Sequence, residues 1–89
     1  MHESGLVGDL VRKADAVVAA DGAHHAVAVS VRTGALSHLS AQHLRTHFAV
    51  ASEGTRLEGA ELAVVADDDP RSLDALDLVL VSVEVAASA

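Results

Sequence analysis

Hydrophobic residues recur every three or four positions near the start of the chain and every second position in its middle. Between residues 6 and 18 the apolar residues have helical spacing and charged residues fall between them, which predicts an amphipathic helix. Its apolar positions are Leu6, Val7, Leu10, Val11, Ala14, Val17 and Val18. The pair Asp21-Gly22 follows, and glycine is the usual residue in a left-handed helix cap. We therefore expect a first helix that ends at this pair.

A strand is predicted next, because apolar residues alternate with small or polar ones between residues 27 and 32. The alternation places Val27, Val29 and Val31 on one face and Ala28, Ser30 and Arg32 on the other. Gly34 interrupts the alternation, so the strand should end before it.

A second helix is predicted from about Ser40 to Ala51, with Ser40 as its N-cap. Leu44, Phe48 and Ala51 form its apolar stripe. Two more strands are expected at about residues 60–66 and 76–85, and the segment between them is polar and contains a proline.

The order of elements is therefore α-β-α-β-β, an α/β fold of the two-layer α+β type with two helices on one face of a three-stranded sheet. The other face should be bare and should carry Ala28, Ser30, Ala63, Val65, Leu78 and Leu80. Residues 79–81 are apolar on both faces, which a homodimer across the bare face or along a strand edge would explain. Ordinary surface valine and leucine explain the same pattern.

The composition excludes several kinds of function. The chain has 89 residues, no cysteine, and Phe48 as its single aromatic residue. These residues therefore offer no disulfide, no thiol nucleophile, no cysteine-rich zinc site and no aromatic platform for base stacking. The net charge of -7 argues against a nucleic-acid partner. No apolar run reaches the length of a membrane span and the start does not resemble a signal peptide, so we expect a cytoplasmic protein.

The first three residues, Met1-His2-Glu3, offer several nitrogen ligands to one metal ion. The candidates are the Met1 amine, the backbone nitrogen and ring Nδ1 of His2, and the backbone nitrogen or side chain of Glu3. If the first helix begins soon after Glu3, its first N–H groups have no acceptor within the helix. A set of nitrogen ligands that can lie nearly in a plane suits Ni(II) or Cu(II) better than Mg(II) or Ca(II). The alternative is that these residues are simply solvated at a frayed terminus.

Three segments of the sequence occur together in a known family. Met1-His2-Glu3 leads into Gly5-Leu6-Val7, a Gly-x-Leu-Ser turn occupies residues 34–37, and residues 53–62 read Glu-Gly-Thr-Arg-Leu-Glu-Gly-Ala-Glu-Leu. With these motifs at matching separations, residues 1 to about 66 resemble the HypA/HybF family, and residues 76–85 resemble its closing strand. Members of that family are nickel metallochaperones for the maturation of NiFe-hydrogenase and, in some organisms, of urease.

The resemblance implies one nickel-binding domain over residues 1–89, in which Met1 and His2 supply ligands and Glu3 tunes or completes the site. Ni(II) is then a cargo that is taken up and handed on, and the protein is not an enzyme. In the family the handover involves the GTPase HypB and the hydrogenase large subunit. A HypB-like GTPase and that subunit are therefore the implied partners.

The sequence departs from the family pattern in two places. Family members normally carry a zinc domain with paired Cys-x-x-Cys motifs between the second and third strands, whereas here a short loop, residues 67–75, bridges the gap and no structural zinc is expected. A glutamate usually follows the turn glycine and an acidic residue often stands a few positions later, but this chain has Ala35 and Ser40 there. His38 lies between them, and is either a replacement metal ligand or an exposed loop histidine.

The other histidines and acidic residues give weaker signals. His43 and His47 have the i, i+4 spacing at which two imidazoles can share a metal ion, although a pair of helix-surface histidines fits better. His24 and His25 fit a loop before the first strand, and the aspartates at 67–69 fit a solvated turn better than a calcium site. The chain has no phosphate-binding glycine loop and no nucleophile elbow, which disfavours a small hydrolase.

Two classes of function therefore remain. The first is a nickel carrier that binds Ni(II) at Met1-His2-Glu3 and delivers it to a maturation partner. The second is a protein interaction module that keeps the fold but binds metal weakly or not at all, and the bare sheet face favours it. The sequence does not distinguish among hydrogenase, urease and other nickel clients.

Overall fold

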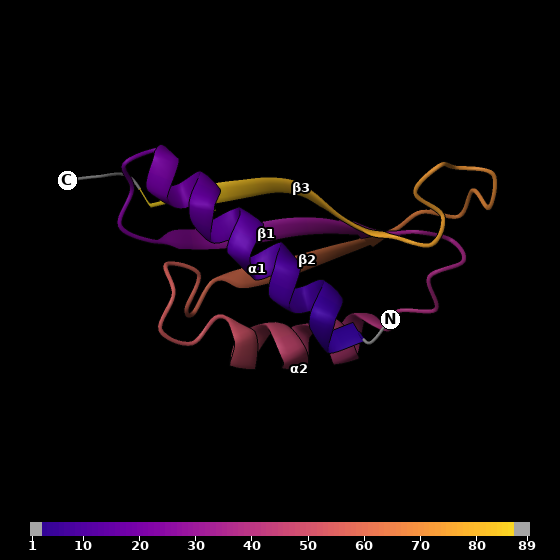
Figure 1. Cartoon of the computed structure of the whole chain (residues 1–89), viewed down its shortest axis with the longest axis horizontal. Coiled ribbons are helices and arrows are strands. Elements are labelled where there is room, and N and C mark those ends of the chain that lie inside the picture. The colour runs from indigo at the N-terminus through magenta and orange to yellow at the C-terminus, as the bar shows by residue number, and fades with distance from the viewer. Residues whose placement is uncertain (1–2, 87–89) are drawn as a thin grey trace.

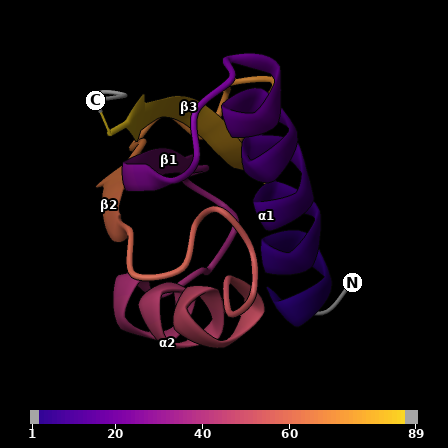
Figure 2. The same cartoon turned by 90° about the vertical axis from the view of Figure 1, so that its left-hand side faces the viewer.

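The computed structural model of the chain describes residues 3–86, and the side chains of residues 5–86. Helices α1 (Glu3–Ala20) and α2 (Ala41–Ala51) and strands β1 (Ala26–Thr33), β2 (Glu61–Ala66) and β3 (Leu78–Val85) follow in the predicted order. Both helices lie on one side of the sheet (Figure 1), and a view turned by 90° shows the two layers (Figure 2). The predicted two-layer α+β fold is confirmed.

Strand β1 is the centre of a three-stranded sheet of order β2-β1-β3. It pairs in parallel with β2 and antiparallel with β3. The parallel pair is joined through α2, because two parallel neighbours need a crossover connection. This topology leaves one edge of β2 and one edge of β3 unpaired within the described residues.

The core fills the space between the helices and the covered face of the sheet. Its buried residues are Val7, Leu10, Val11, Ala14, Val18, Ala26, Val29, Val31, Leu44, Phe48, Leu57 and Leu62. The predicted apolar stripes of both helices are largely confirmed, although Val17, at the flank of the α1 stripe, is half exposed. With one aromatic residue in the chain, aliphatic side chains make up nearly the whole core.

Both helix caps have the predicted residues. Gly22 has a φ of 76°, and the N–H of Ala23 donates to the carbonyl oxygen of Val18 at 3.2 Å, which is the pattern of a Schellman cap. At the start of α2 the Ser40 Oγ accepts a hydrogen bond from the backbone N–H of His43. Neither helix in the described part of the chain combines the length and the apolar character that crossing a bilayer requires.

A β-bulge interrupts the predicted alternation at the start of β1. Ala26 pairs with Val85 and Ala28 with Glu84, so the intervening Val27 is an extra residue on β1. Ala26 is consequently buried, whereas Val27, which the alternation places on the covered face, is 42% exposed. The prediction for Val27 is wrong because strict alternation contains no extra residue.

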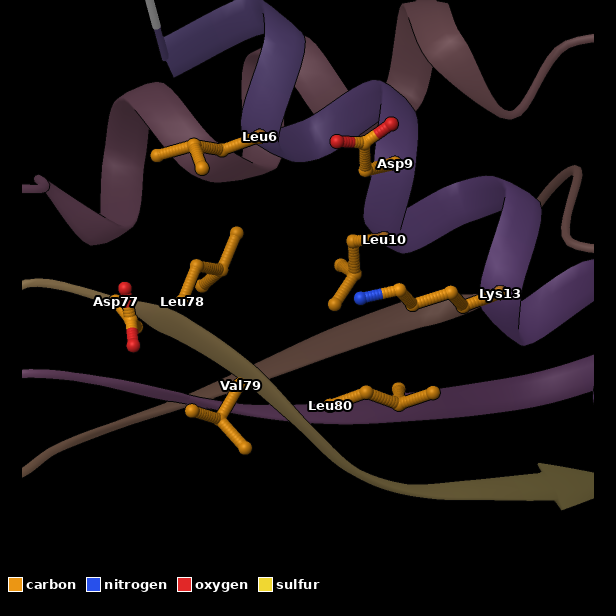
Figure 3. A pocket seen from close by; sticks show the side chains of 8 residues that line it. All are labelled: Leu6, Asp9, Leu10, Lys13, Asp77, Leu78, Val79 and Leu80. Carbon is orange, nitrogen blue, oxygen red and sulfur yellow. The ribbon is translucent and has the colours of Figure 1, made fainter. Parts of the chain in front are cut away.

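A second register shift changes the prediction for β3. Ser30 pairs with Ser82 and Val31 with Leu80, which leaves Val81 as the extra residue. Leu78 and Leu80 therefore pack against the core, and not on the bare face where we expected them. Figure 3 shows Leu78 directed toward α1 and Val79 on the other side of the strand. The change of phase at Val81 explains why residues 79–81 read as apolar on both faces.

The uncovered face of the sheet carries the other residues expected there. Ser30 of β1 pairs with Ala63 of β2, and partners in register share a face, opposite to that of the buried Val29 and Val31. Val65 lies on the same face and is 57% exposed. The homodimer across this face stays a prediction.

Candidate functional site

The predicted nickel ligands are the first three residues of the sequence. Met1 and His2 fall outside the described residues, as does the side chain of Glu3, so the structure does not place them relative to one another. Glu3 is the first residue of the helix. The first four backbone N–H groups of a helix have no acceptor one turn earlier, and they carry the positive end of the helix dipole. Of the backbone nitrogens that the sequence hypothesis names, that of Glu3 belongs to this first turn, and that of His2 lies outside the described residues.

The start of α2 and the loop that contains His38 lie at the same end of the molecule as the start of α1 (Figure 1). His38 is exposed and has a φ of 56°, in the left-handed region that non-glycine residues seldom adopt. The sequence alternatives for His38 are a distal ligand and an exposed loop residue. Its exposure matches the second alternative.

His43 and His47, which share one face of α2 by spacing, differ in their surroundings. His43 is exposed, whereas His47 is half-buried. A hollow of about 360 Å³ between the two helices is lined by Val7, Thr46, His47, Val50 and Ala51. His47 is therefore the α2 histidine that lies against α1.

The remaining polar candidates have structural roles or face solvent. The backbone N–H of Asp69 donates to Asp67 Oδ1 at 3.0 Å, and that of Arg71 donates to Asp69 Oδ1 at 2.9 Å. These aspartates thus close turns, as the solvated-turn interpretation predicts. His24 and His25 are exposed before β1. Among the side chains that the structure describes, no three histidine, aspartate or glutamate residues gather into a group able to hold a metal ion.

A second hollow, which the sequence does not predict, lies between α1 and β3. Its volume is about 500 Å³, and it is lined by Leu6, Asp9, Leu10, Lys13, Asp77, Leu78, Val79 and Leu80. Apolar side chains from the helix and the strand form much of its wall, and the Lys13 side chain extends from α1 toward Leu10 (Figure 3). This hollow depends on how α1 crosses the start of β3, before the bulge at Val81, and no local sequence pattern encodes that crossing.

The glycine of the Gly-x-Leu-Ser turn has a structural explanation. A Cβ atom at Gly34 would lie 2.2 Å from the carbonyl oxygen of Asp74, so only glycine lets these two backbone segments meet. Ser37 Oγ donates to the carbonyl oxygen of Gly34 at 2.7 Å, and the N–H of Leu36 donates to the carbonyl oxygen of Ala75 at 2.7 Å. The turn motif therefore joins the end of β1 to the segment before β3.

The Glu-Gly-Thr-Arg-Leu segment, residues 53–57, also has a structural role. Thr55 Oγ1 donates to the carbonyl oxygen of Ser52 at 2.7 Å and accepts from the N–H of Leu57 at 3.1 Å. This pair of bonds directs Leu57 into the core, where it is fully buried. Arg56 forms an ion pair with Asp15 at 3.0 Å and so fastens the loop to α1. The residues of this motif therefore hold helices, strands and loops together. Of the three family motifs, Met1-His2-Glu3 is the one whose groups could bind a metal ion.

Known proteins resemble the chain over most of its length. Residues 1–69 match the family described as hydrogenase/urease nickel incorporation, metallochaperone, hypA. Hydrogenase maturation factors HypA from Chloroflexus aggregans and Chloroflexus aurantiacus are each 42% identical to it over 64 residues. The aligned part covers 72% of this chain and 56% of each relative, so the chain spans about half the length of the curated relatives it matches.

Solved structures of HypA proteins have the same fold. The solution structure of the Ni metallochaperone HypA from Helicobacter pylori superposes with a TM-score of 0.81 at 20% identity, over 99% of this chain and 100% of that chain. A second solution structure of a HypA protein gives a TM-score of 0.75 at 20% identity, over 99% of this chain and 98% of that chain. At this level of identity the similarity establishes the fold.

Proposed function

Because this chain belongs to the HypA family of hydrogenase/urease nickel incorporation proteins, we propose that it is a nickel metallochaperone that binds Ni(II) at Met1-His2-Glu3. The observation that carries this proposal is the match of residues 1–69 to the family of nickel incorporation proteins, which includes the Met1-His2-Glu3 start. The names of the relatives, hydrogenase maturation factors, agree with a carrier that delivers nickel to an enzyme under maturation.

The proposed site is a set of nitrogen atoms in adjacent chelate rings. The Met1 amine, the His2 amide nitrogen and the His2 ring Nδ1 take three positions around Ni(II), and a group of Glu3 stands close enough to complete or tune the site. Nitrogen ligands of this kind suit Ni(II), whereas oxygen ligands suit Mg(II) and Ca(II). The site requires that Met1 is retained. Only then does the His2 backbone nitrogen, as an amide, lie between the terminal amine and the His2 imidazole in the chain.

In this proposal the protein is a carrier in the cytoplasm and not an enzyme. Nickel is bound reversibly and passed on, and we expect a HypB-like GTPase and the hydrogenase large subunit as its partners, with urease as the other client class. With no cysteine in these residues, no cysteine-based structural zinc site is expected. His38 is retained as a candidate distal ligand, since its loop lies at the same end of the molecule.

A protein interaction module that keeps the family fold is the second candidate. The uncovered sheet face favours it, because Val65 is more than half exposed there and Ala63 lies beside it. A module of this kind would dock partners without taking up nickel. Metal binding therefore separates the two candidates.

Isothermal titration of Ni(II) into protein that begins with Met1 tests the proposal. We expect one nickel per chain with a dissociation constant in the micromolar range or tighter, that is about -8 kcal/mol or more favourable. His2→Ala should abolish this uptake, and so should a variant whose Met1 amine is acetylated, because an acetylated nitrogen no longer offers its lone pair to the metal. Unchanged circular dichroism of both variants is the control, and wild-type protein that takes up no nickel would favour the interaction module.

A further inference from the structure

One flank of α1 and the edge strand β3 enclose two hollows in a row. The residues of this flank have helical spacing and are Leu6, Leu10, Lys13, Val17 and Ala20. The hollow of about 500 Å³ lies between the first half of the flank and the start of β3 (Figure 3). A second hollow, of about 410 Å³, lies further along α1 and is lined by Val17, Ala20, Asp21, Val83 and Val85. The two hollows together form a groove along β3.

The helices cover β3 less completely than they cover the central strand. On β1 the core residues Val29 and Val31 are fully buried. The residues of β3 that pack against the same core are only half-buried, and they are Leu78, Leu80, Val83 and Val85. Within the described residues β3 has no neighbour on its outer edge, so the backbone groups directed to that edge lack a strand partner. Apolar surface and free hydrogen-bonding groups therefore follow the same strand.

Strand β3 carries few of the features that keep sheet edges from pairing. It is eight residues long, contains neither proline nor lysine, and has Glu84 as its one charged residue. The bulge at Val81 is the exception. The opposite edge strand, β2, is six residues long and is followed at once by the aspartates at 67–69. An added strand thus finds more free backbone at β3 than at β2.

The two hollows have the separation of side chains on one face of an extended segment. They meet β3 around residues 79 and 84, and the bulge at Val81 supplies one extra residue between these positions. The separation is therefore about four strand steps, or roughly 13 Å. Side chains four residues apart in a strand point to the same face and lie this far apart. One extended segment can therefore place an apolar side chain in each hollow.

The charges along the groove restrict the kind of segment that fits it. Three charged side chains that line the hollows have no partner among the described residues: Asp77 at the start of β3, Lys13 within α1, and Asp21 just after α1. A complementary segment has an acidic residue midway and basic residues at its ends. A second copy of β3 fits less well, because Asp77 and Glu84 make both of its ends acidic.

We propose that β3 binds an extended segment of a different protein as a fourth strand of the sheet. Two large apolar side chains of this segment, four residues apart, fill the two hollows, and an acidic residue between them meets Lys13. Main-chain hydrogen bonds to the free edge provide affinity, and the hollows and charges provide specificity. The inference goes beyond nickel binding and requires no metal.

Nuclear magnetic resonance of the isotope-labelled, metal-free full chain tests the inference. The probe is the capped peptide Lys-Thr-Leu-Thr-Glu-Thr-Leu-Thr-Lys, which reads the same in both directions and carries its charges and leucines on one face. We expect saturable shifts and slower hydrogen exchange at the amides of β3. The control peptide Lys-Leu-Thr-Thr-Glu-Thr-Thr-Leu-Lys has the same composition but turns its leucines to the other face, so it should bind at least about tenfold more weakly.

Variants of the groove give matched comparisons. Val17→Lys should weaken binding of the first peptide at least about fivefold, because it removes apolar wall and adds a charge beside the peptide's basic end. Val50→Lys is its control, since Val50 is also an exposed helix valine but lies on α2, and it should have no effect. Lys13→Glu should also weaken binding about fivefold, and a peptide with lysine in place of its glutamate should restore it.

Three results would overturn the inference. The first is the absence of shifts at β3 with millimolar peptide, and the second is equal binding of the two peptides. The third is protection of the β3 amides that rises with protein concentration when no peptide is present, because a second copy would then occupy the edge. Each result is independent of nickel uptake, so the proposed function is tested separately by the titration with Ni(II).

Discussion

A Cβ atom at Gly34 would lie 2.2 Å from the main-chain carbonyl oxygen of Asp74, so these two residues meet backbone to backbone. The contact docks the segment before β3 onto the end of β1. Two further hydrogen bonds hold it, from the N–H of Gly34 to the carbonyl of Asp77 and from the N–H of Leu36 to that of Ala75. An ion pair between Arg32 and Asp74, at 3.2 Å, adds to this attachment. The segment where the family usually carries a zinc domain is thus fastened by the turn glycine.

Gly34→Ala should destabilise the protein, because the added methyl group meets backbone atoms that cannot move independently. We expect a loss of about 1–3 kcal/mol in the free energy of unfolding, measured by urea denaturation. Gly8→Ala is the matched control, since its Cβ would make only an ordinary contact in α1 and alanine favours a helix. A Gly34→Ala protein as stable as the wild type would contradict the close contact.

Leu57→Ala should also destabilise the fold, because Leu57 is fully buried although it belongs to a loop. Removing it leaves a cavity and costs about 2–5 kcal/mol in the free energy of unfolding. Leu73→Ala removes the same atoms from a fully exposed position and should change stability by less than about 0.5 kcal/mol. Equal effects of the two substitutions would show that the motif segment does not anchor the core.

We expect two copies of the chain to associate through their bare sheet faces, as the sequence pattern suggests. Val65→Glu places a charge on this face, at an exposed position of the edge strand β2, so it should shift the dimer to monomer in sedimentation velocity at matched concentration. Val50→Glu is the control, because Val50 is even more exposed but lies on α2, on the other side of the sheet. Association that Val50→Glu weakens and Val65→Glu does not would place the interface elsewhere.

Nickel affinity should fall as the pH is lowered from 8 to 6. Protons compete with Ni(II) for the Met1 amine and the His2 imidazole, whose ordinary pKa values are about 8 and 6.5, so the affinity should drop at least about a hundredfold. Displacement of a proton from the amide would steepen this dependence. Circular dichroism should stay unchanged over the same interval, since the loss lies in the ligands and not in the fold. An affinity that is flat with pH would indicate carboxylate ligands.

The sequence predicts the elements well because their signals are local. Helical spacing, the Gly22 cap and the Ser40 N-cap locate α1 and α2 to within three residues of their observed ends. The position of β1 is also clear, since Val29 and Val31 face the core. Local patterns of this kind rest on side-chain spacing and backbone geometry, which need no knowledge of the tertiary partner.

The wrong assignments of residues to the two sheet faces arise where the register of one strand depends on its neighbour. The bulges at Val27 and Val81 are properties of strand pairing, so a single-strand pattern assigns Val27, Leu78 and Leu80 to the wrong faces. The separation of His47 from His43 likewise requires the packing of α1 against α2. The candidate metal ligands at the terminus rest on coordination chemistry and resemblance, and those predictions await measurement.

The most direct test of the terminal nitrogen site is the nickel X-ray absorption spectrum of the loaded protein with Met1 as its first residue. We expect a low-coordinate nickel surrounded by nitrogen, with the outer-shell scattering of a histidine ring, and we expect this signal to vanish when the Met1 amine is acetylated. Nickel in six-fold oxygen coordination, or a spectrum that acetylation of the Met1 amine does not change, would contradict a site built on the chain amine and His2.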